Sequence, residues 1–459
     1  MEERQTHIGI ANLIISFFVV MGMFVFYRLI TDFAFLTNDD MYLQAIVSGE
    51  LSGAPDAHMI HSNMILGLVL KFLYQCSTGI PWYGIYMVGV YFLCAWLILY
   101  RCLSKSNTVI AKIATTVFYL IICFCVLFRH VAMVQYTVLA AFAGGTAIFY
   151  ALTIDMQMEK KKIVREFIIV LFLASVSLII REEVFFMLVP FAAFGWLGKW
   201  IAEKNRLNHI NRRYIIFLLC VISVMICVCA TDRIAYKLGE DAEKWQAFLK
   251  YNKAREQVYD YYLYPDYDSN KELYDEIGIS REAYEGASKH YLLLPQEKIN
   301  SETIQIIAER SKEITKDKIN IKEKIKEVTQ NFIQCNLNYT DRPMNIVVYS
   351  VWLCMVILTI LSKSRNMCTQ LALLFLVRMG MWLYILWQGR YPERITQSLY
   401  FVELIMLVAI FIINKNVIDD KKVLKYLFLC GAVFVICVPS LYVGINKAID
   451  IKGNNARNL

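Results

Sequence analysis

The chain has 459 residues, of which 58% are hydrophobic, 14% aromatic and only 19% charged. This composition excludes an ordinary soluble globular protein and is typical of a polytopic membrane protein. The formal net charge of +8 is concentrated in short loops between apolar segments, where basic residues orient helices and meet anionic membrane lipids. It therefore does not indicate nucleic-acid binding.

The first predicted element is an apolar helix over residues 8–30. It is too long for a signal-peptide core and is followed by acidic residues instead of a small-residue cleavage site, so we expect it to remain as the first membrane span. Further spans are predicted at residues 82–101, 107–128, 131–153, 163–180, 184–201, 211–231, 344–361, 367–387, 395–414 and 423–444. The predicted fold is all-α, with about eleven transmembrane helices.

Basic residues in the connections predict the orientation. The short loops that are inside when the N-terminus is cytoplasmic hold 17 lysines and arginines, many more than the short outside loops, as the positive-inside rule requires of a plasma-membrane protein. Eleven spans then place the C-terminus outside. The short outside loops after the third, fifth and ninth spans hold only four basic residues, which are Arg129, Arg181, Arg390 and Arg394.

The first outside loop, residues 31–80, is predicted to contain two helices that lie in the membrane interface. The first covers residues 39–49 and ends at a run that contains glycine and proline. The second covers residues 56–75. Counting its apolar part as a span would invert every later loop, so we interpret it as an amphipathic interfacial helix.

A polar insert over residues 231–343 separates an N-terminal membrane module, 1–230, from a C-terminal one, 344–459. The insert follows the seventh span and is therefore expected outside the cytoplasm. Apolar residues recur at helical spacing from 304 to 332, which predicts one long amphipathic helix in a mainly helical domain.

The sequence Asn38-Asp39-Asp40 opens the first interfacial helix. Adjacent helical residues point about 100° apart, so only one of the two carboxylates faces a given cleft. The pair is equally consistent with two roles: it complements the helix dipole, or one carboxylate is a general base that deprotonates an acceptor. In the second case Asn38 is a candidate for binding donor or acceptor.

This arrangement of a first span, an acidic pair, two interfacial helices, many spans and an insert after the seventh resembles the GT-C glycosyltransferases. That superfamily includes the protein mannosyltransferases and the lipid A aminoarabinose transferase. The resemblance implies an inverting displacement in which the first loop supplies the catalytic carboxylate and the sugar donor is linked to a polyprenyl phosphate. Asp39 matches the first acidic position of the family, and we favour it over Asp40 as the base. Arg181 resembles an arginine at a similar place in the family.

A polyprenyl-phosphate donor requires cations near the headgroup level, because the leaving phosphate gains charge as the glycosidic bond breaks. Arg129, Arg181, Arg390 and Arg394 are the candidates, with interfacial anchors or surface ion pairs as the alternative. His58, His61 and Asn63 at the start of the second interfacial helix indicate a polar cap or a share in donor or acceptor binding. No metal-ligand spacing, cofactor motif or disulfide framework is recognised.

Two charges occur within predicted spans. Arg378 lies ten residues before the outer turn at Gln388, and Glu403 lies nine residues after Arg394. At about 1.5 Å per residue, both side chains are expected roughly 15 Å below the surface on consecutive antiparallel helices. A lone charge at that depth is costly, so we predict an Arg378 to Glu403 pair with a structural role.

The favoured hypothesis is a membrane glycosyltransferase that moves a sugar from a polyprenyl-phosphate carrier to a cell-envelope glycan or lipid. One alternative is a lipid-linked glycan polymerase or ligase, which shares the donor but does not need the early carboxylates. A transporter is a second alternative, although it predicts related halves and polar residues near the midplane. A non-enzymatic scaffold is a third.

Overall fold

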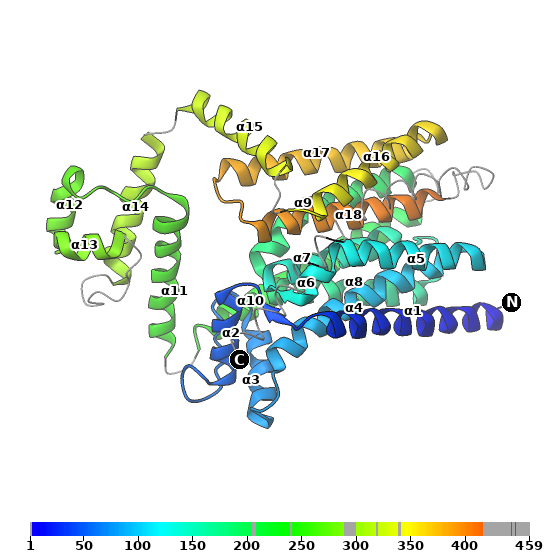
Figure 1. The fold of residues 1–459 in the computed structure, drawn as a ribbon, viewed down its shortest axis with the longest axis horizontal. Coiled ribbons are helices and arrows are strands. Elements are labelled where there is room, and N and C mark those ends of the chain that lie inside the picture. The colour runs from blue at the N-terminus through cyan, green and yellow to red at the C-terminus, as the bar shows by residue number, and fades with distance from the viewer. Residues whose placement is uncertain are drawn as a thin grey trace. The chain divides into compact units, whose positions relative to one another are not determined.

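The computed structural model describes residues 2–203, 208–238, 241–288, 300–317, 320–337 and 341–415, together with Tyr442 and Asn446. Helices dominate these residues (Figure 1). The helices of the first half are α1 (Glu2–Ile30), α2 (Asn38–Ser48), α3 (Met64–Cys76), α4 (Trp82–Ser104), α5 (Val109–Val126), α6 (Phe128–Ala132), α7 (Tyr136–Thr153), α8 (Lys160–Ile180), α9 (Glu182–Glu203) and α10 (Asn208–Ala235). The later ones are α11 (Ala242–Glu256), a π-helix (Gln257–Tyr261), a 3-10 turn (Asp268–Asn270), α12 (Lys271–Glu276), α13 (Arg281–Ser288), α14 (Ser301–Asp317), α15 (Ile321–Leu337), α16 (Met344–Ser362), α17 (Arg365–Trp387) and α18 (Glu393–Asn414).

Ten helices in the described part of the chain are long and apolar enough to cross a membrane. They coincide with the first ten predicted spans, and the chain is an all-α, multi-pass integral membrane protein. The eleventh predicted span, 423–444, lies outside the described residues except for Tyr442.

The chain divides into two compact units. The first contains the described residues of Met1–Ala230, Asn338–Met381 and Pro392–Leu459, and the second contains those of Thr231–Leu337 and Trp382–Tyr391. All ten candidate spans contribute to the first unit, and the polar insert forms most of the second.

Helix α7 is the centre of the first unit. All of its residues are buried, and it packs against α4, α8, α9 and α18 (Figure 1). Its alanines and glycines allow this, because small residues let helix backbones approach closely in membranes. A Cβ atom at Gly144 would lie 2.4 Å from Cδ1 of Leu188 and 2.7 Å from Oγ of Ser177. The hydroxyl of Ser177 also donates to the carbonyl oxygen of Ala140 at 2.7 Å, which joins α8 to α7.

The loop between α1 and α4 folds against one end of this bundle. Strand β1 (Ala34–Phe35) pairs in parallel with β2 (Met133–Val134), which directly precedes α7. Helix α2 ends at Gly49, whose φ of 85° is the left-handed conformation that favours glycine at a helix C-terminus. The first interfacial helix was therefore predicted with nearly correct bounds.

The prediction of a second interfacial helix over 56–75 is wrong in its first part, because α3 begins only at Met64. Tertiary hydrogen bonds hold the preceding segment in an irregular conformation. The Ser62 hydroxyl donates to the carbonyl oxygen of Ile180 at 2.8 Å, and the Asn63 side chain accepts from Ile65 N at 2.9 Å as the N-cap of α3. Gly67 completes the arrangement, since a Cβ atom there would lie 1.9 Å from the carbonyl oxygen of Ala57.

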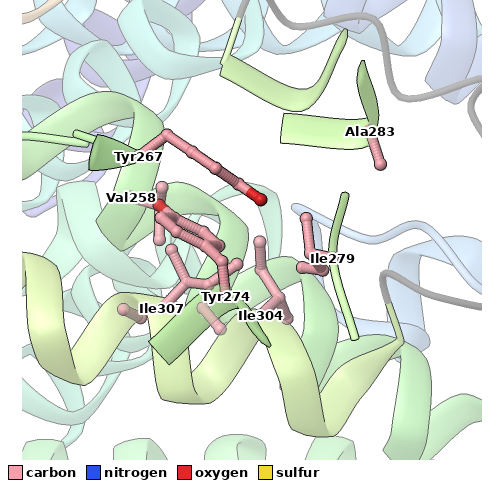
Figure 2. Close-up of a cluster of buried hydrophobic side chains, with 9 residues drawn as sticks. Val258, Tyr267, Tyr274, Ile279, Ala283, Ile304 and Ile307 are labelled. Atoms are coloured by element: carbon pink, nitrogen blue, oxygen red, sulfur yellow. The ribbon is translucent and has the colours of Figure 1, made fainter. Parts of the chain in front are cut away.

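The second unit has its own core of aromatic and aliphatic side chains (Figure 2). The rings of Tyr267 and Tyr274 stack with centroids 5.2 Å apart, over Ile304 and Ile307 of α14. One long helix over 304–332 was predicted, and this is wrong: Asn320 lies outside the helices, and its side chain accepts from Lys322 N at 3.1 Å as α15 begins.

Candidate functional site

The two adjacent carboxylates of α2 lie in different environments. The Asp40 side chain is fully buried, whereas that of Asp39 is 31% exposed. This difference follows from the 100° step between neighbouring helical residues: one carboxylate points into the bundle and the other along its edge. Sequence spacing predicted that only one would face a cleft, but could not say which.

Hydrogen bonds of Asp40 connect the first loop to the N-terminal ends of α4 and α7. Its Oδ1 accepts a hydrogen bond from the Tyr83 hydroxyl of α4 at 3.1 Å and from the backbone N–H of Tyr136 at 3.2 Å, and its Oδ2 accepts from the Thr37 hydroxyl at 2.9 Å. Tyr136 is the first residue of α7, so the carboxylate also lies at the positive end of that helix dipole. Because Asp40 accepts three hydrogen bonds at a helix N-terminus, its role is to hold the loop in place.

Burial raises the pKa of Asp40 from 3.8 to about 6, although the hydrogen bonds from Thr37, Tyr83 and Tyr136 oppose that rise. A second buried carboxylate, Asp341, behaves alike: burial raises its pKa to about 6, while the Thr396 hydroxyl donates to it at 2.8 Å. Carboxyls with raised pKa values at a cleft are candidates for proton transfer, and they are also sites where folding becomes pH-dependent.

We expect the protein to be more stable at pH 5 than at pH 7. An acid whose pKa is raised on folding contributes most below its unfolded value of about 4, and that contribution is lost as the pH rises through its folded value of about 6. Each of Asp40 and Asp341 should therefore add about 1 kcal/mol between pH 7 and pH 5. Thermal unfolding in detergent at both pH values measures this. Asp40→Asn should reduce the difference in stability between pH 5 and pH 7, whereas Glu50→Gln, at an exposed carboxylate, should not. An unchanged difference in Asp40→Asn would refute the raised pKa of Asp40.

Tyr136 lies at the centre of the polar cluster. The Arg181 guanidinium lies 4.7 Å from the centre of the Tyr136 ring, and the His61 ring stacks on it with centroids 6.4 Å apart. Asp39, Asp40, Arg181 and Arg394 all lie within electrostatic range of this tyrosine. We use the name Tyr136 cluster for Asp39, Asp40, His61, Tyr136, Arg181 and Arg394.

The two arginines of the Tyr136 cluster are held differently. Arg394, near the start of α18, has its Nη1 atom 3.4 Å from Oδ2 of Asp39, a long contact for an ion pair. Arg181 donates to the hydroxyl of Thr137, and its Nε atom is buried without a hydrogen bond even though Glu183 Oε2 lies 3.5 Å away. The contact with Glu183 is long and Glu183 is exposed, so the charge of Arg181 is only loosely compensated, a property suited to binding an anion.

Two other predicted arginines are neutralised. Arg129 forms an ion pair with Glu393. Arg390 belongs to the second unit, where its Nη1 atom lies 2.8 Å from Oδ2 of Asp260 and 3.1 Å from Oε1 of Glu256. Partly buried carboxylates already compensate both charges, which favours a structural role over phosphate binding for this pair of arginines.

Of the polar candidates in the first loop other than the acidic pair, His61 belongs to the Tyr136 cluster and the others lie outside it. Asn38 is exposed at the start of α2. His58 and His61 were predicted at the start of the second interfacial helix, but both precede α3. Nδ1 of His58 lies 2.6 Å from Oδ1 of Asp56. Asn63 caps α3 and donates from Nδ2 to the carbonyl oxygen of Val228 at 3.4 Å. His61 joins the Tyr136 cluster through its stacking on the ring of Tyr136.

Sequence reasoning missed Tyr83, Tyr136 and Asp341. Tyrosines at the ends of apolar spans are common interfacial anchors, so neither tyrosine carried a distinctive signal. Asp341 lies close to the cis Arg342–Pro343 peptide bond, within the segment that was assigned to the insert. Each becomes a candidate only through contacts with residues far away in the sequence.

The predicted intramembrane pair is present. Nε of Arg378 lies 2.9 Å from Oε2 of Glu403, and both side chains are buried. Arg378 Nη2 also donates to the hydroxyl of Tyr349 at 2.8 Å, and the indole N–H of Trp352 donates to Glu403 at 3.4 Å. The pair thus joins α16, α17 and α18 through fully partnered charges, as expected for ionisable groups at membrane depth.

The fold and this site define a class: a multi-pass, all-α membrane protein that gathers two carboxylates, two arginines, a histidine and a tyrosine where a loop meets the ends of its spans. Comparison with protein-family models, with curated proteins and with solved structures found no match to the chain. Its function is therefore argued from the site alone.

Proposed function

We propose that the protein is an integral membrane glycosyltransferase that transfers a sugar from a polyprenyl-phosphate carrier to a cell-envelope glycan or lipid. The observation that carries the proposal is the Tyr136 cluster, in which a half-buried carboxylate, Asp39, adjoins cationic groups at the end of a helical membrane bundle. A transfer of this kind needs a base for the acceptor hydroxyl and cations for the leaving phosphate, both at the membrane surface.

Each residue has a role in this proposal. Asp39 is the general base, because its carboxylate is partly exposed and only loosely held by Arg394. Asp40 positions the loop through its three hydrogen bonds. Arg181 binds the phosphate of the donor, since its charge is only loosely compensated by exposed Glu183 and its guanidinium is fixed on the ring of Tyr136. His61 is placed to contact donor or acceptor.

The side of the membrane is part of the proposal. The basic residues of the chain favour a cytoplasmic N-terminus, which places the Tyr136 cluster and the insert at the outer face of the plasma membrane. Polyprenyl-linked sugars that build an envelope are consumed on that side. A polymerase or ligase that uses the same donor would account for the arginines equally well, but it would give Asp39 no catalytic role.

Donor binding tests the proposal. Arg181→Ala should weaken the binding of a polyprenyl phosphate by about tenfold or more, because a charge-assisted hydrogen bond contributes roughly 1.5–3 kcal/mol. Binding is measured with the full-length protein in lipid nanodiscs. Arg212→Ala is the matched control, since Arg212 is an exposed residue near the start of α10. Arg390→Ala should have a smaller effect than Arg181→Ala, and equal affinities for all variants would contradict the role of Arg181.

A further inference from the structure

An apolar groove runs along the first unit, and none of the residues of the Tyr136 cluster line it. It has a volume of about 710 Å³ and is lined by α4, α5, α7, α16 and α18. Val117 and Phe411 form part of its wall and are 52% and 40% exposed, so the groove opens on the side of the bundle. The side of a membrane protein faces lipid chains, and the volume lies within the 300–1,000 Å³ that is typical of ligand sites.

Two lysines close one end of the groove. Lys105 follows α4 and Lys415 follows α18, and both line the cavity. The Lys415 ammonium donates to the carbonyl oxygen of Lys105 and lies within electrostatic range of the Lys105 ammonium. In the described part of the chain, no carboxylate lies within ion-pair distance of either lysine.

The neighbouring charges leave this lysine end with a net positive charge. Asp155 and Glu166 lie within electrostatic range of Lys105, and Asp155 offsets one of the two lysine charges. Glu166 is paired with Arg101, however, which itself adds positive charge beside Lys105. Two ammonium groups held together at partial burial repel each other, and an anion between them relieves the repulsion.

The lysine end and the Tyr136 cluster lie at opposite ends of the same helices. Helix α4 begins beside Tyr83, which contacts Asp40, and α18 begins beside Arg394, which contacts Asp39. Both helices end at the lysines, and each spans about 30 Å at 1.5 Å per residue. The groove is thus separate from the proposed donor site and does not depend on the proposed function.

The groove extends over the whole length of α5. Its lining includes Lys105 and Ser106, which precede that helix, and Leu127, which follows it. The 18 residues of α5 span about 27 Å at 1.5 Å per residue, close to the hydrocarbon core of about 30 Å. We propose that the groove binds an acyl chain of an anionic phospholipid whose phosphate lies between Lys105 and Lys415.

Lipid selectivity tests the headgroup part of this proposal. The full-length protein in detergent should bind phosphatidylglycerol at least tenfold more tightly than phosphatidylcholine with the same acyl chains, as measured by native mass spectrometry. The double variant Lys105→Gln/Lys415→Gln should lose this preference. Lys161→Gln should keep it, because Lys161 is exposed near the start of α8, at the same end of the bundle. Equal affinities for the two lipids in the wild type, or a full preference in the double variant, would overturn the proposal.

Photocrosslinking tests the occupant without changing the lysines. The photoreactive residue p-benzoylphenylalanine replaces Phe118, which lines the groove on α5, and the protein is irradiated in membranes that contain phosphatidylglycerol. A phospholipid adduct at this position is the expected result. A crosslink to residues 423–444 of the same chain, or to a second copy of the protein, would show a different occupant and overturn the proposal.

Discussion

Asp39→Asn is expected to reduce sugar transfer by about 10²- to 10⁴-fold, the usual contribution of a general base. The substitution keeps the volume of the side chain and removes its ability to take a proton. Because Asp39 is partly exposed and makes a single long contact with Arg394, thermal stability should stay close to that of the wild type. Transfer is measured as release of free polyprenyl phosphate from a lipid-linked sugar, with envelope extract as acceptor.

Matched variants separate this loss from a structural defect. Glu50→Gln removes an exposed carboxylate just after α2 and should leave transfer unchanged. Asp40→Asn should disturb the loop instead, since its amide group cannot accept all three hydrogen bonds, and leaving a buried donor unsatisfied costs about 1–3 kcal/mol. Full activity in Asp39→Asn, measured with donor binding intact, would remove Asp39 from the proposed role and favour a polymerase or ligase.

Breaking the Arg378–Glu403 pair should give the largest loss of stability. Glu403→Gln leaves the buried Arg378 guanidinium without the carboxylate that compensates its charge, and removing one partner of a buried ion pair costs about 3–5 kcal/mol. Arg378→Met should be similarly harmful. Unfolding in detergent, followed by circular dichroism, measures both.

A double-mutant cycle shows whether the two charges act as a pair. Arg378→Met/Glu403→Gln removes both charges, so its loss of stability should be smaller than the sum of the two single losses by more than 1 kcal/mol, as for contacting residues. Arg365→Met, an exposed arginine at the start of α17, is the control and should have little effect. Additive losses would mean that the pair contributes no coupling energy.

Membrane spans were predictable because length and hydrophobicity dominate their behaviour in a bilayer. The same one-dimensional reasoning located the Arg378–Glu403 pair, since depth along a helix follows from a count of residues. Helix ends that depend on tertiary contacts were not predictable. Ser62 and Asn63 form hydrogen bonds with the end of α8, more than a hundred residues away in sequence, and α3 therefore begins later in the sequence than predicted.

Only part of the site was predictable. The acidic pair and the outer-loop arginines are unusual in an apolar chain, and the sequence therefore indicates them as candidates. It does not indicate that Arg181 and Arg394 lie near Tyr136, whereas Arg129 and Arg390 form ion pairs with Glu393 and with Glu256 and Asp260. Those differences depend on Glu393, Glu256 and Asp260, which are ordinary charged residues until the chain is folded.

The hydrogen bond between Asp40 and the backbone of Tyr136 also sets an order of events during synthesis. The two residues are 96 positions apart. A ribosome that adds roughly 5–20 residues per second makes Tyr136 about 5–20 seconds after Asp40. During that interval the first loop has left the ribosome, but neither β2 nor the start of α7 exists to receive it. The loop that carries the carboxylates can therefore reach its final form only after α7 has been inserted, and a nascent chain arrested before that point should leave the loop open to proteases.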